Sequence, residues 1–160
     1  MLRSMKKTLF GLLALSALST AAAATSVGAS VGSGVSLHLQ NDLTSSSAMR
    51  YSLNLNATNF NFNRLSVGGS VDYLADFNAN DAALGGLNPY YGIGLGAEVG
   101  LGAGSSISLT PQGTLGLRYN VTPPLSIFVE GSLGVKVTVG AGGGVAPAGN
   151  ARIGLNYRLP

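Results

Sequence analysis

Residues 91–100 read YGIGLGAEVG, a run in which every second residue is large or apolar. The odd positions carry Tyr91, Ile93, Leu95, Ala97 and Val99. The even positions carry three glycines and Glu98 within the strand-like run 91–99. A dinucleotide-binding turn would need Gly-x-Gly-x-x-Gly between a strand and a helix, but here the third glycine is Gly96 and no helical pattern follows. The period of two therefore predicts a β-strand with two unlike faces.

The same alternation recurs along the rest of the chain. Six further segments show it, at 27–39, 49–57, 65–73, 107–121, 125–139 and 151–159. Runs rich in Gly, Pro, Asn, Asp and Ser separate these segments, and no segment has a helical period. The sequence predicts an all-β chain of consecutive antiparallel strands.

The first 24 residues have the features of a secretory signal peptide. Residues 1–7 are basic, residues 8–19 are apolar, and the alanines that follow offer cleavage after Ala23 or Ala24. The apolar run is too short for a membrane anchor, which needs about 20 residues. We therefore expect a signal peptide at 1–24 and one β-barrel domain at 25–160.

The expected mature chain has no net charge, because the formal charge of +3 comes from Arg3, Lys6 and Lys7 within the signal peptide. Without an excess of basic residues, no nucleic-acid partner is expected. The chain has no cysteine, which excludes disulfides and thiolate metal sites. No cofactor is predicted.

Alternation alone does not say which face is inside, but composition favours a polar interior. Only 9% of residues are charged, whereas a soluble domain has about 25%. Charges on the even face would lie in a narrow lumen, where each needs a partner. The predicted lumen charge network consists of Arg50, Asp72, Glu98, Arg118, Glu130, Lys136, Arg152 and Arg158. Within it, a hairpin that turns near Pro123 would bring Glu130 within reach of Arg118.

Five of the six tyrosines share the odd face and lie near strand ends. With antiparallel strands they all fall at one rim of the barrel, as an interfacial aromatic girdle would. These residues are Tyr51, Tyr73, Tyr91, Tyr119 and Tyr157. Leu74 and Phe128 are the exceptions to the alternation, because they are apolar residues at even positions.

The segments NPYYGIGLGAEVG, GLRYNVTPPLSIFVEGSLGV and GNARIGLNYRLP follow a signal peptide, and together they resemble the small outer-membrane β-barrel proteins of diderm bacteria, the OmpX and opacity-type group. The resemblance lies in pattern more than in a specific motif. It implies an eight-stranded, antiparallel, up-and-down transmembrane barrel in the outer membrane. It also implies contact with outer-membrane lipid and insertion by the barrel-assembly machinery. The chain departs from the group by ending in Leu159 and Pro160 instead of an aromatic residue.

Seven segments are clear in the sequence, whereas bacterial single-chain barrels have an even number of strands. We expect the first segment to fold back at Gly32–Gly34 into two short strands, which gives eight. A periplasmic C-terminus, as is usual in the group, would make residues 76–88 a long periplasmic connection.

Catalytic chemistry is not predicted. His38 is the only histidine and lies on the even face, where a polar filler role is expected more than a place in a Ser–His–acid triad. No cluster of His, Asp and Glu has metal-ligand spacing. The expected function is a structural or envelope role, with a side-chain-filled polar lumen and no open solute pore. The alternatives are a barrel-embedded lipid-modifying enzyme, and a soluble exported β-barrel that holds a small apolar ligand in an apolar interior.

Overall fold

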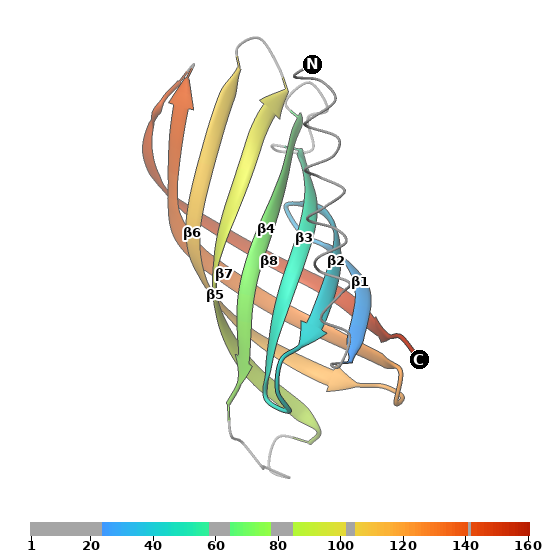
Figure 1. The fold of residues 1–160 in the computed structure, drawn as a ribbon. Helices are drawn as coiled ribbons and strands as arrows, with labels where there is room; N and C mark the ends of the chain where they lie inside the picture. The colour runs from blue at the N-terminus through green and yellow to red at the C-terminus, as the bar shows by residue number, and fades with distance from the viewer. Residues whose placement is uncertain (1–23, 58–64, 78–84, 102–104, 141) are drawn as a thin grey trace.

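The computed structural model describes residues 24–57, 65–77, 85–101, 105–140 and 142–160, and these form one closed β-barrel (Figure 1). The predicted signal peptide lies almost entirely outside the described residues. The strands are β1 (Thr25–Val31), β2 (Gly34–Asp42), β3 (Ser47–Ala57), β4 (Leu65–Asp76), β5 (Leu87–Leu101), β6 (Ser106–Asn120), β7 (Leu125–Gly140) and β8 (Gly144–Arg158). Each strand pairs antiparallel with the next, and β8 closes on β1. The predicted eight-stranded up-and-down barrel is confirmed, as is the expected fold-back of the first segment between Val31 and Gly34. Within the described part of the chain, no helix is long and apolar enough to cross a membrane.

The register keeps odd residues opposite odd residues all the way around the barrel. Leu39 of β2 pairs with Val27 of β1 and with Tyr51 of β3, and the other strand pairs show the same parity. Because a shift of one residue would turn a strand's apolar set to the opposite face, this common parity keeps one face of every strand inside. Leu37, Ile93 and most of the other large odd-numbered side chains are exposed, whereas the serines, amides and most charges of the even face are partly or fully buried.

The two rims of the barrel differ. The two ends of the barrel, Thr25 in β1 and Arg158 in β8, lie at one rim, here called the terminal rim, together with the last residues of β2, β4 and β6. The opposite rim, here called the far rim, holds the last residues of β1, β3, β5 and β7. Strand length rises from 7 residues in β1 to 16 in β7, so the wall of the barrel is not equally high all the way around.

The last strand was expected at 151–159, and this expectation was wrong at its start. In the structure β8 begins at Gly144, and residues up to Ala148 pair with the far end of β7. The sequence at 144–150, GVAPAGN, is rich in glycine and alanine and contains Pro147, and it has almost no alternation of apolar and polar residues. Such a composition is typical of a turn. The pairing with β7 holds this segment as a strand, since backbone hydrogen bonds do not depend on side-chain identity.

An apolar cluster lies inside the barrel. It consists of Leu74, Tyr90 and Phe128, three even-numbered residues that are almost completely buried. Leu74 and Phe128 were the two exceptions to the alternation, and Tyr90 is the sixth tyrosine, which lies outside the predicted girdle. All three have even numbers, and even-numbered residues of the strands face the interior, as the charged residues also do.

Candidate functional site in the barrel interior

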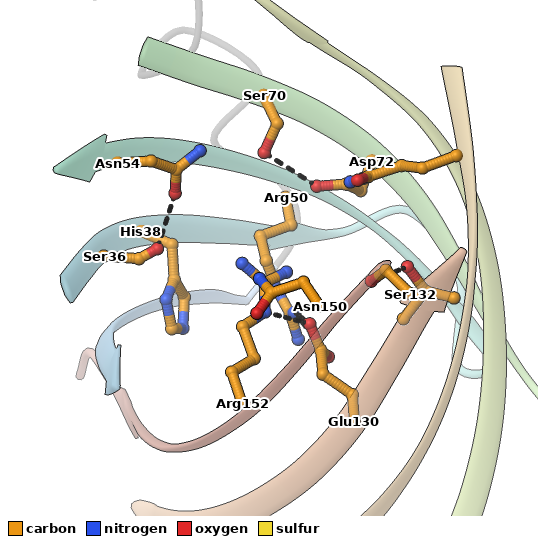
Figure 2. A network of polar contacts seen from close by, with 12 residues as sticks. Ser36, His38, Arg50, Asn54, Ser70, Asp72, Glu130, Ser132, Asn150 and Arg152 are labelled. Carbon is orange, nitrogen blue, oxygen red and sulfur yellow. Dashed lines mark hydrogen bonds and ion pairs between the residues drawn. The ribbon is translucent and has the colours of Figure 1, made fainter. Parts of the chain in front are cut away.

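Four side chains from four strands meet at the middle of the lumen and form what we call the central cluster: Arg50, Tyr90, Glu130 and Arg152. Nη1 of Arg50 lies 2.8 Å from Oε2 and 3.1 Å from Oε1 of Glu130. Nε of Arg152 donates to Oε1 of Glu130, and the Tyr90 hydroxyl donates to Oε2. Figure 2 shows Arg50 and Arg152 converging on Glu130 across the interior. One carboxylate therefore ties β3, β5, β7 and β8 together.

Further contacts satisfy the buried guanidinium of Arg50. Its relative exposure is 1%, its guanidinium lies 4.9 Å from the centre of the Phe128 ring, and Nη2 donates to Oε1 of Gln40 at 3.3 Å. Hydrogen bonds and ring contact offset the loss of hydration that a buried charge would otherwise suffer. Phe128, a member of the apolar cluster, therefore contacts a buried charge in a lumen that is mainly polar.

Asp72 lies directly opposite Arg50 in the register of β3 and β4, yet it forms no ion pair among the described residues. Its carboxylate accepts hydrogen bonds from Ser70 Oγ at 3.1 Å and from Gln112 Nε2 at 2.9 Å. Gly94 makes room for it, because a Cβ at that position would overlap Oδ1 of Asp72. The absence of a side chain at position 94 is thus a packing requirement.

Glu130 is a diagonal neighbour of Arg118, as expected, but the two residues do not form an ion pair. The hairpin places Arg118 opposite Phe128, as the turn near Pro123 suggested. However, Arg118 Nη2 bonds to both oxygens of Asp76, at 2.7 and 2.8 Å, because Glu130 is already engaged by two arginines of the central cluster. Asp76 has even parity like the other lumen charges, but its strand was expected to end at residue 73.

The remaining predicted network members pair near the rims. Lys136 Nζ lies 3.1 Å from Oε1 of Glu98, towards the far rim. Arg158 Nη2 lies 2.7 Å from Oδ2 of Asp42 at the terminal rim, where Arg158 is exposed. Asp42 was missed for the same reason as Asp76: its even parity was available in the sequence, but the strand was ended too early.

Two cavities lie on either side of the central cluster. One, of about 180 Å³, lies towards the far rim, and its lining includes Glu98 and Lys136. The other, of about 500 Å³, lies at the terminal rim, and its lining includes Asp76 and Arg118. Arg50, Tyr90 and Glu130 line neither cavity. They fill the section between the two.

The five tyrosines of the predicted girdle all face outward in the half of the barrel near the terminal rim. Tyr157 pairs with Leu125 at the start of β7, and Tyr119 pairs with Leu87 at the start of β5. Tyr73 lies three residues from the end of β4, while Tyr51 and Tyr91 lie in the first five residues of β3 and β5.

His38 points into the lumen and is almost completely buried. Its Nε2 is within hydrogen-bond distance of Asn156 Oδ1, and its ring meets Phe128 edge-on at 5.6 Å. The described residues contain no group of three or more His, Asp and Glu side chains that could hold a metal ion. The apolar interior that the soluble ligand-binding alternative requires is contradicted, since the lumen face of the described strands is mainly polar.

No family model matches this sequence, and no curated protein is significantly similar to it. Two solved structures share the fold. Neisserial surface protein A (NspA) superposes with a TM-score of 0.56 at 16% identity, over 86% of this chain and 94% of that one. A major outer membrane protein from Thermus thermophilus gives a TM-score of 0.52 at 16% identity, over 86% of this chain and all of that one. At this identity the likeness shows a shared barrel fold.

Proposed function

We propose that this protein is an integral outer-membrane β-barrel with a structural role in the cell envelope and a lumen closed by side chains. The observation that carries the proposal is the outward apolar face of all eight strands. Leu133, in the middle of β7, is 78% exposed, and Leu115 on β6 and Ile93 on β5 are also more than half exposed. A soluble protein rarely exposes a contiguous apolar surface that surrounds the whole molecule, whereas a transmembrane barrel requires one.

The position of the five outward tyrosines supports the same proposal. Tyrosines on the outer face near one rim fit the water–lipid boundary, because the ring is apolar and the hydroxyl remains hydrated. We propose Tyr51, Tyr73, Tyr91, Tyr119 and Tyr157 as the interfacial girdle on the side of the terminal rim.

The shared fold adds support, since the two solved structures are described as a surface protein and a major outer membrane protein. Together with the expected signal peptide, it favours export, insertion by the barrel-assembly machinery and a final place among outer-membrane lipids. We propose neither a nucleic-acid partner nor a cofactor. We propose a structural role for the charge network, which cross-links distant strands through the lumen.

Envelope fractionation tests the location. We expect the full chain, expressed in a diderm bacterium, to appear in the outer-membrane fraction. On SDS gels the unboiled sample should migrate differently from the boiled one, because a closed barrel resists the detergent until it is heated. A protein that is recovered in the soluble periplasmic fraction and shows no heat-dependent shift would overturn the proposal.

A further inference from the structure

The barrel wall is low along β1 and β2. These strands have 7 and 9 residues, whereas β7 has 16 and β8 has 15. All four meet at the terminal rim, where Thr25 pairs with Asn41 and Ser26 with Arg158. The shortfall therefore lies at the far rim, as Figure 1 shows: β1 and β2 (blue) stop near the middle of the barrel, while β5 and β6 (yellow) and β7 (orange) continue upward. With a rise of about 3.3 Å per residue and a tilt of about 40°, the hairpin tip lies on the order of 20 Å below the far end of β7.

Among the described residues, this low section leaves part of the edge of β8 without a neighbouring strand. β8 pairs with β7 from Gly144 to Tyr157, but with β1 only from Ile153 to Arg158. The tip of the β1–β2 turn reaches as far as Asn150, where Ser33 Oγ donates to Oδ1 at 2.8 Å. No described residue pairs with the outer edge of β8 at 144–149. We call the opening between the turn at 32–34 and this edge the notch.

The edge lacks one of the hydrogen-bond donors that a further strand would pair with. The carbonyl oxygens of Ala151 and Leu155 point towards β1, since a Cβ added at Gly32 or Gly28 would overlap them. The N–H and C=O groups of successive residues in a strand point to alternate sides. The odd residues of β8 therefore all direct these groups towards the side of β1, which in 144–149 is the open edge. Pro147 is odd and has no N–H to offer, a recurrent feature that protects an exposed edge. An occupant other than a β-strand is indicated.

The smaller cavity reaches the notch from inside. Its lining includes Gly32, Ser33 and Gly34 on one side of the notch and Ala148, Gly149 and Asn150 on the other. Val31, Val35 and Val145 expose apolar side chains on the outer surface around the notch. An apolar belt is about 25 Å tall in barrels of this kind, so a notch that descends this far brings lipid next to a polar cavity.

The polar groups of the cavity suit a zwitterion. Lys136 and Glu98 form a partly exposed ion pair there, and Asn56 Nδ2 donates to Glu98 at 2.9 Å. Ser30, which also lines the cavity, is 3% exposed, and its hydroxyl has no hydrogen-bond partner among the described residues. A buried hydroxyl without a partner is uncommon and points to a group that the protein alone does not provide.

We infer that the notch admits the zwitterionic headgroup of a bilayer phospholipid, with phosphate at Lys136, ammonium at Glu98, and the acyl chains outside against the valines. A cavity of about 180 Å³ is smaller than the roughly 300–1,000 Å³ of sites that enclose a whole ligand, so only the headgroup enters. This inference rests on the proposed membrane location.

Native mass spectrometry of the protein released from vesicles of equal phosphatidylethanolamine and phosphatidylglycerol tests the inference. We expect one phosphatidylethanolamine to be retained, at least ten-fold over phosphatidylglycerol. Lys136→Met combined with Glu98→Gln removes both charges together and should reduce retention at least five-fold. The matched control is Arg118→Met with Asp76→Asn, an ion pair in the other cavity, which should retain lipid like the wild type. Heat-shifted migration on gels confirms that each variant is folded.

A phosphatidylethanolamine that carries a photoreactive group at the end of one acyl chain distinguishes a failure of the headgroup site from a failure of the membrane location. Labelling of outward residues around the barrel supports the membrane location, and its absence overturns the proposed function. Labelling without selective retention, or retention that is unchanged in Lys136→Met with Glu98→Gln, overturns the headgroup site alone. A probe with the reactive group next to the glycerol should label peptides that contain 31–35 and 144–150 preferentially. Even labelling around the far rim would contradict the notch as the entry.

Discussion

Among single residues, Glu130 organises the interior, because it accepts hydrogen bonds from Arg50, Tyr90 and Arg152. Two of the three donors, Arg50 and Tyr90, come from strands that do not pair with β7. Such a residue holds the barrel cross-section together, since the removal of one partner from a buried ion pair leaves uncompensated charge.

Glu130→Ala should therefore lower the free energy of unfolding by about 3–5 kcal/mol. Urea titration of the protein in lipid vesicles, followed by the heat-shifted gel band, measures this loss. The matched control is Asp42→Ala, which breaks the exposed pair with Arg158 and should cost about 0–1 kcal/mol. Equal losses in the two variants would show that the central cluster contributes no more to the free energy of unfolding than an exposed ion pair does.

Gly94→Ala tests the space that Asp72 needs. The added Cβ would overlap Asp72 Oδ1 and lie 2.8 Å from the backbone oxygen of Val71, so we expect a loss of about 1–3 kcal/mol. Gly96→Ala on the same strand and face is the control, because its nearest atom is 3.7 Å away. There we expect no loss, or a gain of about 0.5 kcal/mol from reduced chain entropy. The same urea titration compares the two, and a larger loss at Gly96 would contradict the packing assigned to Asp72.

Within an element, each strand divides its residues between two environments. β7 shows this most completely, with Leu133, Val135 and Val137 outside and Ser132 and Lys136 inside. The parity is preserved from strand to strand, so every hairpin inherits the same division. A substitution should therefore act according to its face and its depth, more than according to its strand.

Leu133→Arg should cost about 2–4 kcal/mol in a bilayer, because Leu133 lies in the middle of β7 and faces outward. Leu43→Arg, in the exposed turn after β2, should cost about 0–1 kcal/mol, since a charge near the interface remains hydrated. Refolding yield and urea midpoints in vesicles measure both. Similar tolerance at the two sites would indicate that the outer face does not contact lipid.

In the whole molecule, the central cluster lies in the lumen between the two cavities, and Arg50, Tyr90 and Glu130 line neither of them. Arg50 and Tyr90 are among the largest fully buried side chains of the described residues. The geometry of eight strands leaves an interior that side chains just fill, which accounts for a barrel without an open pore.

In planar bilayers we expect the wild type to show no steady conductance. Arg50→Ala with Tyr90→Ala should produce a measurable ion leak, because the two cavities would be joined while the Glu130–Arg152 pair stays intact. Arg118→Ala with Asp76→Ala widens only the cavity at the terminal rim and should remain closed. A wild type that conducts as freely as the first variant would contradict the closed lumen.

The division of the chain into two faces follows from the sequence, because a period of two needs no knowledge of partners. The low content of charged residues then assigns the polar face, with Arg118, to the interior and the apolar face, with Tyr91, to the outside. The sequence also indicates the turn at Gly32–Gly34 that completes eight strands. Which charges meet depends on the folded barrel, since the register and the distance across the lumen bring Arg50 to Glu130 and Arg118 to Asp76. The extension of β8 to Gly144, beyond its neighbour β1, likewise depends on the fold, because a strand persists wherever a partner offers backbone hydrogen bonds, whatever its side chains are.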